Sequence, residues 1–204
     1  DVELLLMVDI SRSMSAAELE LQRQGYVEAL RSDSVAAALG RALTGRIALA
    51  YVEWAGEGRQ NILQDWTLIE SREDLFAVAD AIEMERTFTQ SRTSITAALR
   101  YGVAYFDANA FDSMRRVIDI SGDGPNNQGG PVVAARDAAL ARGIIINGLP
   151  LMTDDGAFMR IDDLDVYYDR CVIGGPGAFV VPVTDWADFS EAVTRKLVLE
   201  IAGV

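Results

Sequence analysis

The chain has 204 residues, of which 50% are hydrophobic, and it carries a formal net charge of -13 at neutral pH. A chain of this size can bury one substantial core, so we expect a single domain over residues 1–204. The acidic balance argues against nucleic-acid binding, because contacts with phosphate groups need clustered lysine and arginine. No apolar stretch in the sequence approaches the roughly 20 residues that a transmembrane helix needs.

The scarcity of three residue types excludes several kinds of chemistry. The sequence contains no histidine, Lys196 is its only lysine and Cys171 is its only cysteine. Without histidine, the chain lacks the most common general base, the Ser-His-Asp and Cys-His nucleophile systems and the ordinary histidine zinc sites. A single cysteine excludes an internal disulfide and a thiolate metal cluster.

The predicted elements alternate between strands and helices, with one hairpin. The apolar run at residues 2–8 is typical of a buried parallel strand. Residues 46–54 and 61–69 predict two strands joined by the turn Gly56-Glu57-Gly58, so the second strand is antiparallel to the first. The segment 153–173 is acidic and aromatic and gives no clear pattern. Periodicity predicts further strands at 116–121, 144–149 and 178–183, and helices at 16–31, 34–43, 72–82, 94–106, 131–142 and 186–201.

This order of elements predicts the fold class. Strands that alternate with helices form a three-layer, doubly wound, Rossmann-like α/β fold with a mostly parallel sheet. The hairpin adds one antiparallel edge strand. In open sheets of this kind, ligands bind beyond the carboxyl ends of the strands. Polar residues at those ends are therefore the first candidates for a functional site.

Polar side chains follow the first strand at the point where it ends. Asp9, Ser11 and Ser13 place one carboxylate and two hydroxyls at alternating positions, from which all three can turn toward one point. Oxygen ligands that converge on a point suit a hard cation such as Mg2+. The alternative is a polar strand end in which Ser13 or Ser15 caps the following helix.

Two further loops reach the same edge of the predicted sheet. Thr93 precedes a predicted helix, and Asp123 follows a predicted strand between Gly122 and Gly124. The flanking glycines let the backbone turn sharply and bring the carboxylate close to another loop. Taken singly, Thr93 is equally well a helix cap and Asp123 part of an ordinary turn. All the candidates together favour one shared site.

The order Asp-x-Ser-x-Ser, then Thr, then Asp-Gly on successive loops resembles the metal motif of the von Willebrand factor type A (vWA) domain, an integrin I-like domain. The resemblance covers almost the whole chain and includes the single antiparallel edge strand. More narrowly, the sequence resembles an uncharacterised bacterial subgroup of that family, whose members are typically exported. The segments that carry this narrower resemblance are Val8-Asp9-Ile10-Ser11, Leu21-Gln22-Arg23-Gln24-Gly25-Tyr26, Val52-Glu53-Trp54-Ala55-Gly56, Ile118-Asp119-Ile120-Ser121-Gly122-Asp123-Gly124 and Gly174-Gly175-Pro176-Gly177-Ala178-Phe179.

The resemblance implies a metal-ion-dependent adhesion site (MIDAS) in a non-enzymatic protein-binding module. In such sites the two serines, here Ser11 and Ser13, bind a divalent cation directly. Thr93 would bind directly when a ligand is present, whereas Asp9 and Asp123 would act mainly through water. Mg2+ is the expected ion, with Mn2+ or Ca2+ as alternatives. Its open coordination position would accept an Asp or Glu carboxylate of a partner protein.

Two departures from the family pattern affect the details. Arg12 stands between the two serines, where small residues are commoner; it would help to attract an acidic ligand, as would Arg92, or else point to solvent. The threonine loop lacks the glycine pair often found there, so Thr89 and Thr96 are alternatives to Thr93. We favour Thr93 because it lies at the helix entrance. The resemblance also implies a periplasmic or extracellular location, although no signal peptide is visible in the chain.

Two other functions remain open on the residues alone. A Mg2+-dependent phosphatase or phosphotransferase would use Asp9 as its nucleophile. Such enzymes usually carry a second aspartate two residues on, where this chain has Ser11, and a lysine near the phosphate, whereas Lys196 is far along the last predicted helix. The other function is a metal-independent vWA scaffold.

Asp119 lies within an apolar strand, where an unpaired charge is costly. It either braces the glycine loop, Gly122-Asp123-Gly124, or faces water at an edge.

Overall fold

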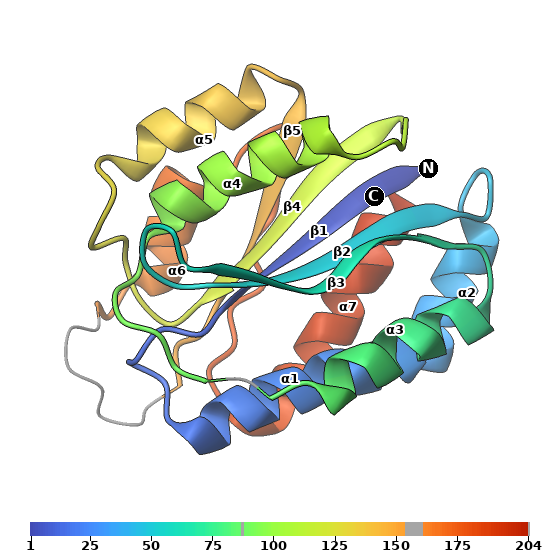
Figure 1. Cartoon of the computed structure of the whole chain (residues 1–204), viewed down its shortest axis with the longest axis horizontal. Coiled ribbons are helices and arrows are strands. Elements are labelled where there is room, and N and C mark those ends of the chain that lie inside the picture. Colours follow the sequence, from blue (N-terminus) through green and yellow to red (C-terminus); the bar gives the residue numbers. More distant parts are fainter. Residues whose placement is uncertain (87, 154–160, 204) are drawn as a thin grey trace.

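A central sheet with helices on both of its faces forms the molecule (Figure 1). The computed structural model describes residues 1–86, 88–153 and 161–203. The five strands lie in the order β3-β2-β1-β4-β5. The predicted three-layer α/β class, with its mostly parallel sheet, is confirmed. The strands are β1 (Val2–Asp9), β2 (Ile47–Trp54), β3 (Gln60–Ile69), β4 (Arg115–Gly122) and β5 (Ile144–Pro150).

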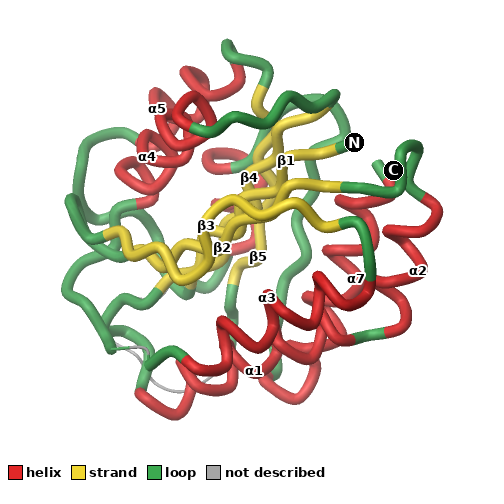
Figure 2. The backbone as a smooth tube through the Cα atoms, turned by 45° about the vertical axis from the view of Figure 1, so that its right-hand side comes forward, coloured by secondary structure: helices red, strands yellow, loops and turns green. Residues whose placement is uncertain are grey.

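The helices divide between the two faces of the sheet, as Figures 1 and 2 show. One face carries α1 (Ala16–Arg31), α2 (Asp33–Arg41), α3 (Arg72–Met84) and α7 (Phe189–Ala202). The other face carries α4 (Ile95–Ala108), α5 (Val132–Leu140) and α6 (Leu164–Tyr167), the last continued by a π-helical turn, Tyr168–Val172. Within the described ranges, no helix has the length and apolar character needed to cross a membrane.

Strand β1 lies at the centre of the sheet because all of its side chains are apolar or internally paired. Each of its eight residues is buried. It pairs in parallel with β2 on one side and with β4 on the other. The hairpin predicted from Gly56-Glu57-Gly58 is confirmed, since β3 pairs antiparallel to β2 at the edge. The carboxyl ends of β1, β2, β4 and β5 therefore lie along one edge of the sheet.

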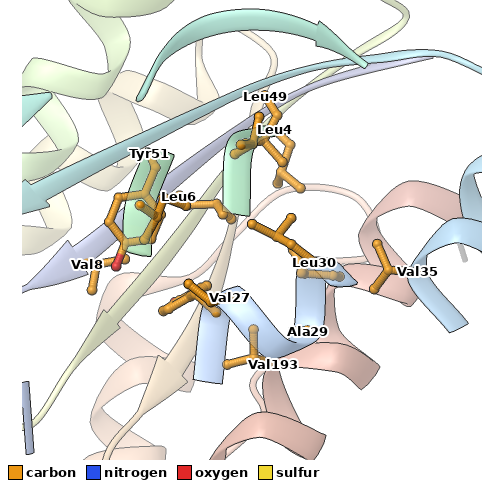
Figure 3. Close-up of a cluster of buried hydrophobic side chains, with 14 of the residues drawn as sticks. Leu4, Leu6, Val8, Val27, Ala29, Leu30, Val35, Leu49, Tyr51 and Val193 are labelled. Atoms are coloured by element: carbon orange, nitrogen blue, oxygen red, sulfur yellow. The ribbon is translucent and has the colours of Figure 1, made fainter. Parts of the chain in front are cut away.

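The two core layers follow from the alternation of side chains along β1. Leu4, Leu6 and Val8 belong to the cluster that packs against α1, where Val27 and Leu30 meet them (Figure 3). The intervening Leu5 and Met7 join the cluster under α4. Successive strand residues point to opposite faces, so a continuous apolar run fills both layers. Each fully buried leucine contributes about 2 kcal/mol through the hydrophobic effect.

One predicted strand is wrong. Residues 178–183 form only isolated bridges with the edge of β5, Gly148 with Val180 and Leu151 with Val183. Pro182 lies between the two bridges and has no N–H to donate, so the ladder is not continuous. The last predicted helix also differs at its start, because a 3-10 turn, Trp186–Asp188, precedes α7. Of the unclear segment, residues 154–160 lie outside the described residues.

A buried ionic cluster joins α7 to β4 and corrects both expectations for Asp119. Lys196 Nζ lies 2.8 Å from Asp119 Oδ1 and 2.5 Å from Glu200 Oε1. Asn147 Nδ2 on β5 donates to the same glutamate oxygen at 2.9 Å. Asp119 therefore neither faces water nor braces the glycine loop in the described contacts. Its ion pair with the only lysine offsets the cost of burying its charge.

We expect this cluster to make stability depend on pH through Glu200. Burial, followed by the nearby charge of Asp119, raises the pKa of Glu200 from 4.5 to about 7. Between these values the folded chain keeps a proton that the unfolded chain has lost. The free energy of unfolding should therefore fall as pH rises from about 4.5 to 7, by an amount on the order of 3 kcal/mol.

The measurement is urea denaturation between pH 4 and 8, in the presence of a chelator, for wild type and Glu200→Gln. Because glutamine does not titrate, the difference between the two proteins isolates this group. Glu191→Gln, at an exposed position of the same helix, is the control and should follow wild type. Parallel curves for wild type and Glu200→Gln would contradict the prediction.

Candidate metal-binding site

The register of the sheet brings the ends of β1 and β4 together. Val8 pairs with Ser121, so Asp9 and Asp123 leave adjacent parallel strands at the same edge. Gln22 of α1 donates its side-chain amide to the carbonyl of Asp9 at 2.9 Å. This buried hydrogen bond holds the backbone at the point where the chain leaves β1. No pattern in the sequence predicts this role of Gln22.

Four of the five predicted site residues form one chain of oxygen atoms, in which each lies within hydrogen-bonding distance of the next. Ser11 donates its backbone N–H to Asp9 Oδ1 at 2.8 Å and its hydroxyl to Asp9 Oδ2 at 3.1 Å. The hydroxyls of Ser11 and Ser13 are 2.9 Å apart. Ser13 in turn donates to Asp123 Oδ1 at 2.7 Å. The loop after β1 and the loop after β4 therefore meet, as predicted.

Burial gives this arrangement a strong electrostatic character. Asp9 is fully buried and Asp123 is 3% exposed, whereas Ser13 is exposed. Burial, and next the negative charge of Asp123, raise the pKa of the Asp9 carboxyl well above its ordinary value. Two carboxylates that share a site of low polarity repel each other. A cation at the exposed side would relieve that repulsion.

The loop that carries Thr93 is bound to both of the other loops. Gln90 donates its N–H to the carbonyl of Ile10 at 2.8 Å, next to the metal motif. Thr93 accepts an N–H from Asn127 at 2.9 Å, and its own N–H donates to Asn127 Oδ1 at 3.0 Å. These contacts place Thr93, which is 5% exposed, beside the other candidates. Among the described residues, its hydroxyl takes no part in the chain of oxygen atoms.

Neighbouring serines, and not the candidate metal ligands, cap the two helices near the site. Ser94, not Thr93, caps α4, because its hydroxyl accepts the N–H of Ala97 at 3.1 Å. Likewise Ser15, not Ser13, caps α1 through a capping box. The helix-cap interpretation is therefore wrong for both Thr93 and Ser13. Thr96 is occupied elsewhere, since its hydroxyl donates to the carbonyl of Gly130 at 3.0 Å.

A close backbone approach positions the Thr93 loop. A Cβ atom at Gly56 would lie 2.8 Å from the carbonyl of Ser91 and 3.0 Å from Arg92 Cβ. Arg92 is also the one non-glycine residue in the described chain with a positive φ, 73°. This conformation costs on the order of 1 kcal/mol, and the residue that adopts it immediately precedes Thr93. Backbone strain of this kind is typical of functional loops.

The donor set fits a hard cation. Among the described residues, no group of three or more His, Cys, Asp or Glu side chains is placed to hold an ion. An ion here would instead use two carboxylates together with hydroxyl oxygens. Ser11 donates its hydrogen to Asp9 and so keeps its oxygen lone pairs available. Oxygen-only ligands of this type suit Mg2+, Mn2+ or Ca2+.

Comparison with known proteins bears on this arrangement. The family model described as "Protein of unknown function (DUF1194)" matches residues 1–204. Comparison with curated proteins found no match. Proximal thread matrix protein 1 (PTMP1) of the mussel byssus has a TM-score of 0.71 and 12% identity over 99% of this chain. Another structure of PTMP1 has a "zinc occupied MIDAS motif".

Two bacterial structures have the same fold. A von Willebrand factor type A protein from Catenulispora acidiphila has a TM-score of 0.65 and 16% identity over 98% of this chain. The pilus adhesin SpaC of Lactobacillus rhamnosus GG has a TM-score of 0.69 and 14% identity, also over 98%. This chain covers 48%, 42% and 30% of PTMP1, the Catenulispora protein and SpaC respectively. The likeness shows that the chain has the vWA fold.

We expect Gly56→Ala to destabilise the protein. The new methyl group would meet backbone of the Thr93 loop, which cannot move without losing its contacts with Asn127, so a cost of roughly 1–3 kcal/mol is expected. Gly40→Ala is the matched control, because a Cβ there has nothing within 4 Å and lies in α2, where alanine is favoured. Urea denaturation of both variants measures the difference. Equal stabilities would contradict the assigned close approach.

Proposed function

We propose that this chain, which belongs to the DUF1194 family, is a non-enzymatic protein-binding module that binds its partner through a divalent cation. The observation that carries the proposal is the chain of closely spaced oxygen atoms from Asp9 through Ser11 and Ser13 to Asp123. It gathers oxygen atoms from two loops around one exposed point. The loop that carries Thr93 supports the proposal, because Thr93 donates its backbone N–H to Asn127 in the loop that follows β4.

The residues divide into two roles in this proposal. Ser11, Ser13 and Thr93 would hold the ion directly through their hydroxyl oxygens, and Asp9 and Asp123 would hold it mainly through water. Neutral hydroxyls leave much of the positive charge uncompensated. When bound, the cation would supply an open coordination position that attracts an Asp or Glu carboxylate of the partner. The exposed side chain of Ser13 marks the side from which the partner approaches.

Related structures support the choice of a divalent cation and of an adhesive role. The zinc-occupied MIDAS is a property of PTMP1, and SpaC is described as a pilus adhesin. The oxygen ligands of this chain favour Mg2+ over zinc, with Mn2+ or Ca2+ as alternatives, because zinc prefers nitrogen and sulfur. The byssal and pilus settings of those proteins also support a periplasmic or extracellular location for this one.

Positive charge around the site supports an acidic partner. Arg12 and Arg92, which flank the candidate ligands along the chain, are both exposed. A cavity of about 280 Å³ is lined by Ile10, which follows Asp9, and its charged lining residues are Arg59, Arg86 and one carboxylate, Glu53. None of these four arginines forms an ion pair with a described residue. On a chain with net charge -13, this edge would draw in negative charge.

The enzymatic alternative has less support. A nucleophilic Asp9 needs access to substrate, but its carboxylate is fully buried and accepts two hydrogen bonds from Ser11. A phosphate-binding lysine is the second requirement. Lys196 is fully buried between Asp119 and Glu200. Neither group meets the requirement of a phosphotransferase.

The metal site is tested by removing its two proposed serine ligands. We expect the wild-type protein to bind Mg2+ and Mn2+ in calorimetry, and the double variant Ser11→Ala/Ser13→Ala to lose at least about tenfold in affinity, because the remaining side chains are mainly water-mediated. Ser34→Ala, at an exposed position of α2, is the control and should bind as wild type does.

A wild-type protein that binds neither ion, or a double variant that binds both ions unchanged, would refute the metal site. The metal-independent scaffold predicts a different result in a pull-down assay. A partner held through the cation should be lost when a chelator is added, whereas a partner held on a metal-independent surface should be retained.

The role of the arginines near the site, Arg12, Arg59, Arg86 and Arg92, is tested with a capped peptide that carries two glutamates. Binding is measured in the presence of Mn2+. Arg59→Gln/Arg86→Gln should weaken binding roughly threefold or more at low salt, because two favourable charges are lost near the site. The loss should shrink as ionic strength rises. Arg41→Gln, at an exposed position in the last turn of α2, serves as the control. Equal losses in both variants would count against an acidic partner at this edge.

A further inference from the structure

Tyr168 has a buried hydroxyl that the fold itself does not use. The side chain is fully buried, and its hydroxyl has no hydrogen-bond partner among the described residues. Leaving such a group unpaired costs about 1–3 kcal/mol. The residue also begins a π-helical turn, Tyr168–Val172. Such turns are rare and often occur at functional sites.

Two glycines make room for this ring under the candidate site. A Cβ atom at Gly148 on β5 would lie 2.7 Å from Tyr168 Cδ1. A Cβ atom at Gly122, the last residue of β4, would lie 2.8 Å from the Tyr168 hydroxyl and 3.0 Å from Asp9 Oδ2. The hydroxyl and the carboxylate therefore border the same small space. No other residue type at 122 leaves that space open.

The neighbouring residue ties the same segment to the site. Tyr167 accepts the backbone N–H of Asn126 at 3.2 Å. Asn126 Oδ1 accepts the N–H of Thr96 at the start of α4. The α6 segment is thus fixed against the loop that follows β4, and Tyr168 is held in place beneath Asp9. A donor held in this position can orient a carboxylate without contact with solvent.

We propose that Tyr168 is a positioning residue of the metal site, whose hydroxyl donates a hydrogen bond through one water to the Asp9 carboxylate when the ion is bound. This inference rests on the proposed function and deepens it. The hydrogen bond fixes the oxygen of Asp9 that receives the Ser11 hydroxyl, so the Ser11 lone pairs face the ion. Burial, then the charges of Asp9 and Asp123, raise the pKa of Tyr168 and keep its proton available for donation.

The test compares Tyr168→Phe with wild type in three measurements: Mg2+ affinity by calorimetry, the electron paramagnetic resonance spectrum of bound Mn2+, and thermal unfolding with and without Mg2+. We expect roughly a tenfold loss of Mg2+ affinity, which is typical for a residue that orients a metal ligand, and an altered Mn2+ spectrum. Without metal, the variant should unfold no earlier than wild type, because it loses a hydroxyl that has no partner there.

Tyr26→Phe is the matched control. Tyr26 is also a fully buried tyrosine, but it lies in the core layer on the other face of the sheet. It should bind metal as wild type does. Equal affinity and spectrum in Tyr168→Phe and wild type would overturn the inference while leaving the metal site intact. A wild-type protein that binds no metal would refute the proposed function and this inference together.

Discussion

The structure depends on one electrostatic constraint, the placement of two carboxylates side by side at the end of parallel strands. Asp9 and Asp123 leave β1 and β4 at the same edge, and both are buried. Their repulsion in a medium of low polarity is strong. Ser11 and Ser13 lie between them and moderate it with hydrogen bonds of 2.7–3.1 Å. In the proposed function, this arrangement prepares the site for a cation.

Asp119 on β4 and Asp9 at the end of β1 are both buried, but their charges have different surroundings. Asp119 has its own cation, Lys196, and the pair fastens α7 to the sheet. Asp9, the last residue of β1, forms no ion pair with a described residue. The first arrangement is structural, because its charge is already neutralised within the chain. The second has no cation among the described residues, and the proposed binding function supplies one from solution.

Close backbone approaches hold the three loops at this edge. Gly56 lets the hairpin meet the Thr93 loop, and Gly122 leaves the space that Asp9 and Tyr168 share. Asn127 connects the loop after β4 with the Thr93 loop through two hydrogen bonds. A small error in any one loop would separate oxygen atoms that need to lie within about 3 Å of each other. The surrounding residues therefore fix the geometry that the polar side chains use.

Local patterns in the sequence predicted most of the elements and the candidate ligands. The apolar run of β1 and the hairpin are set by interactions between near neighbours along the chain, and so were predicted correctly. The grouping of Asp9, Ser11, Ser13 and Asp123 followed because parallel strands end at one edge. Thr93 is placed beside them, and its role as an ion ligand stays a prediction.

Only the tertiary structure decided which distant side chains meet. The pair between Asp119 and Lys196, the support from Gln22 and the position of Tyr168 join segments far apart in sequence. The segment 178–183 has the composition of a strand but forms only isolated bridges, because pairing depends on what the edge of β5 offers. Periodicity reports which face of an element is buried. It carries no information on the partner that covers that face, which is fixed by packing.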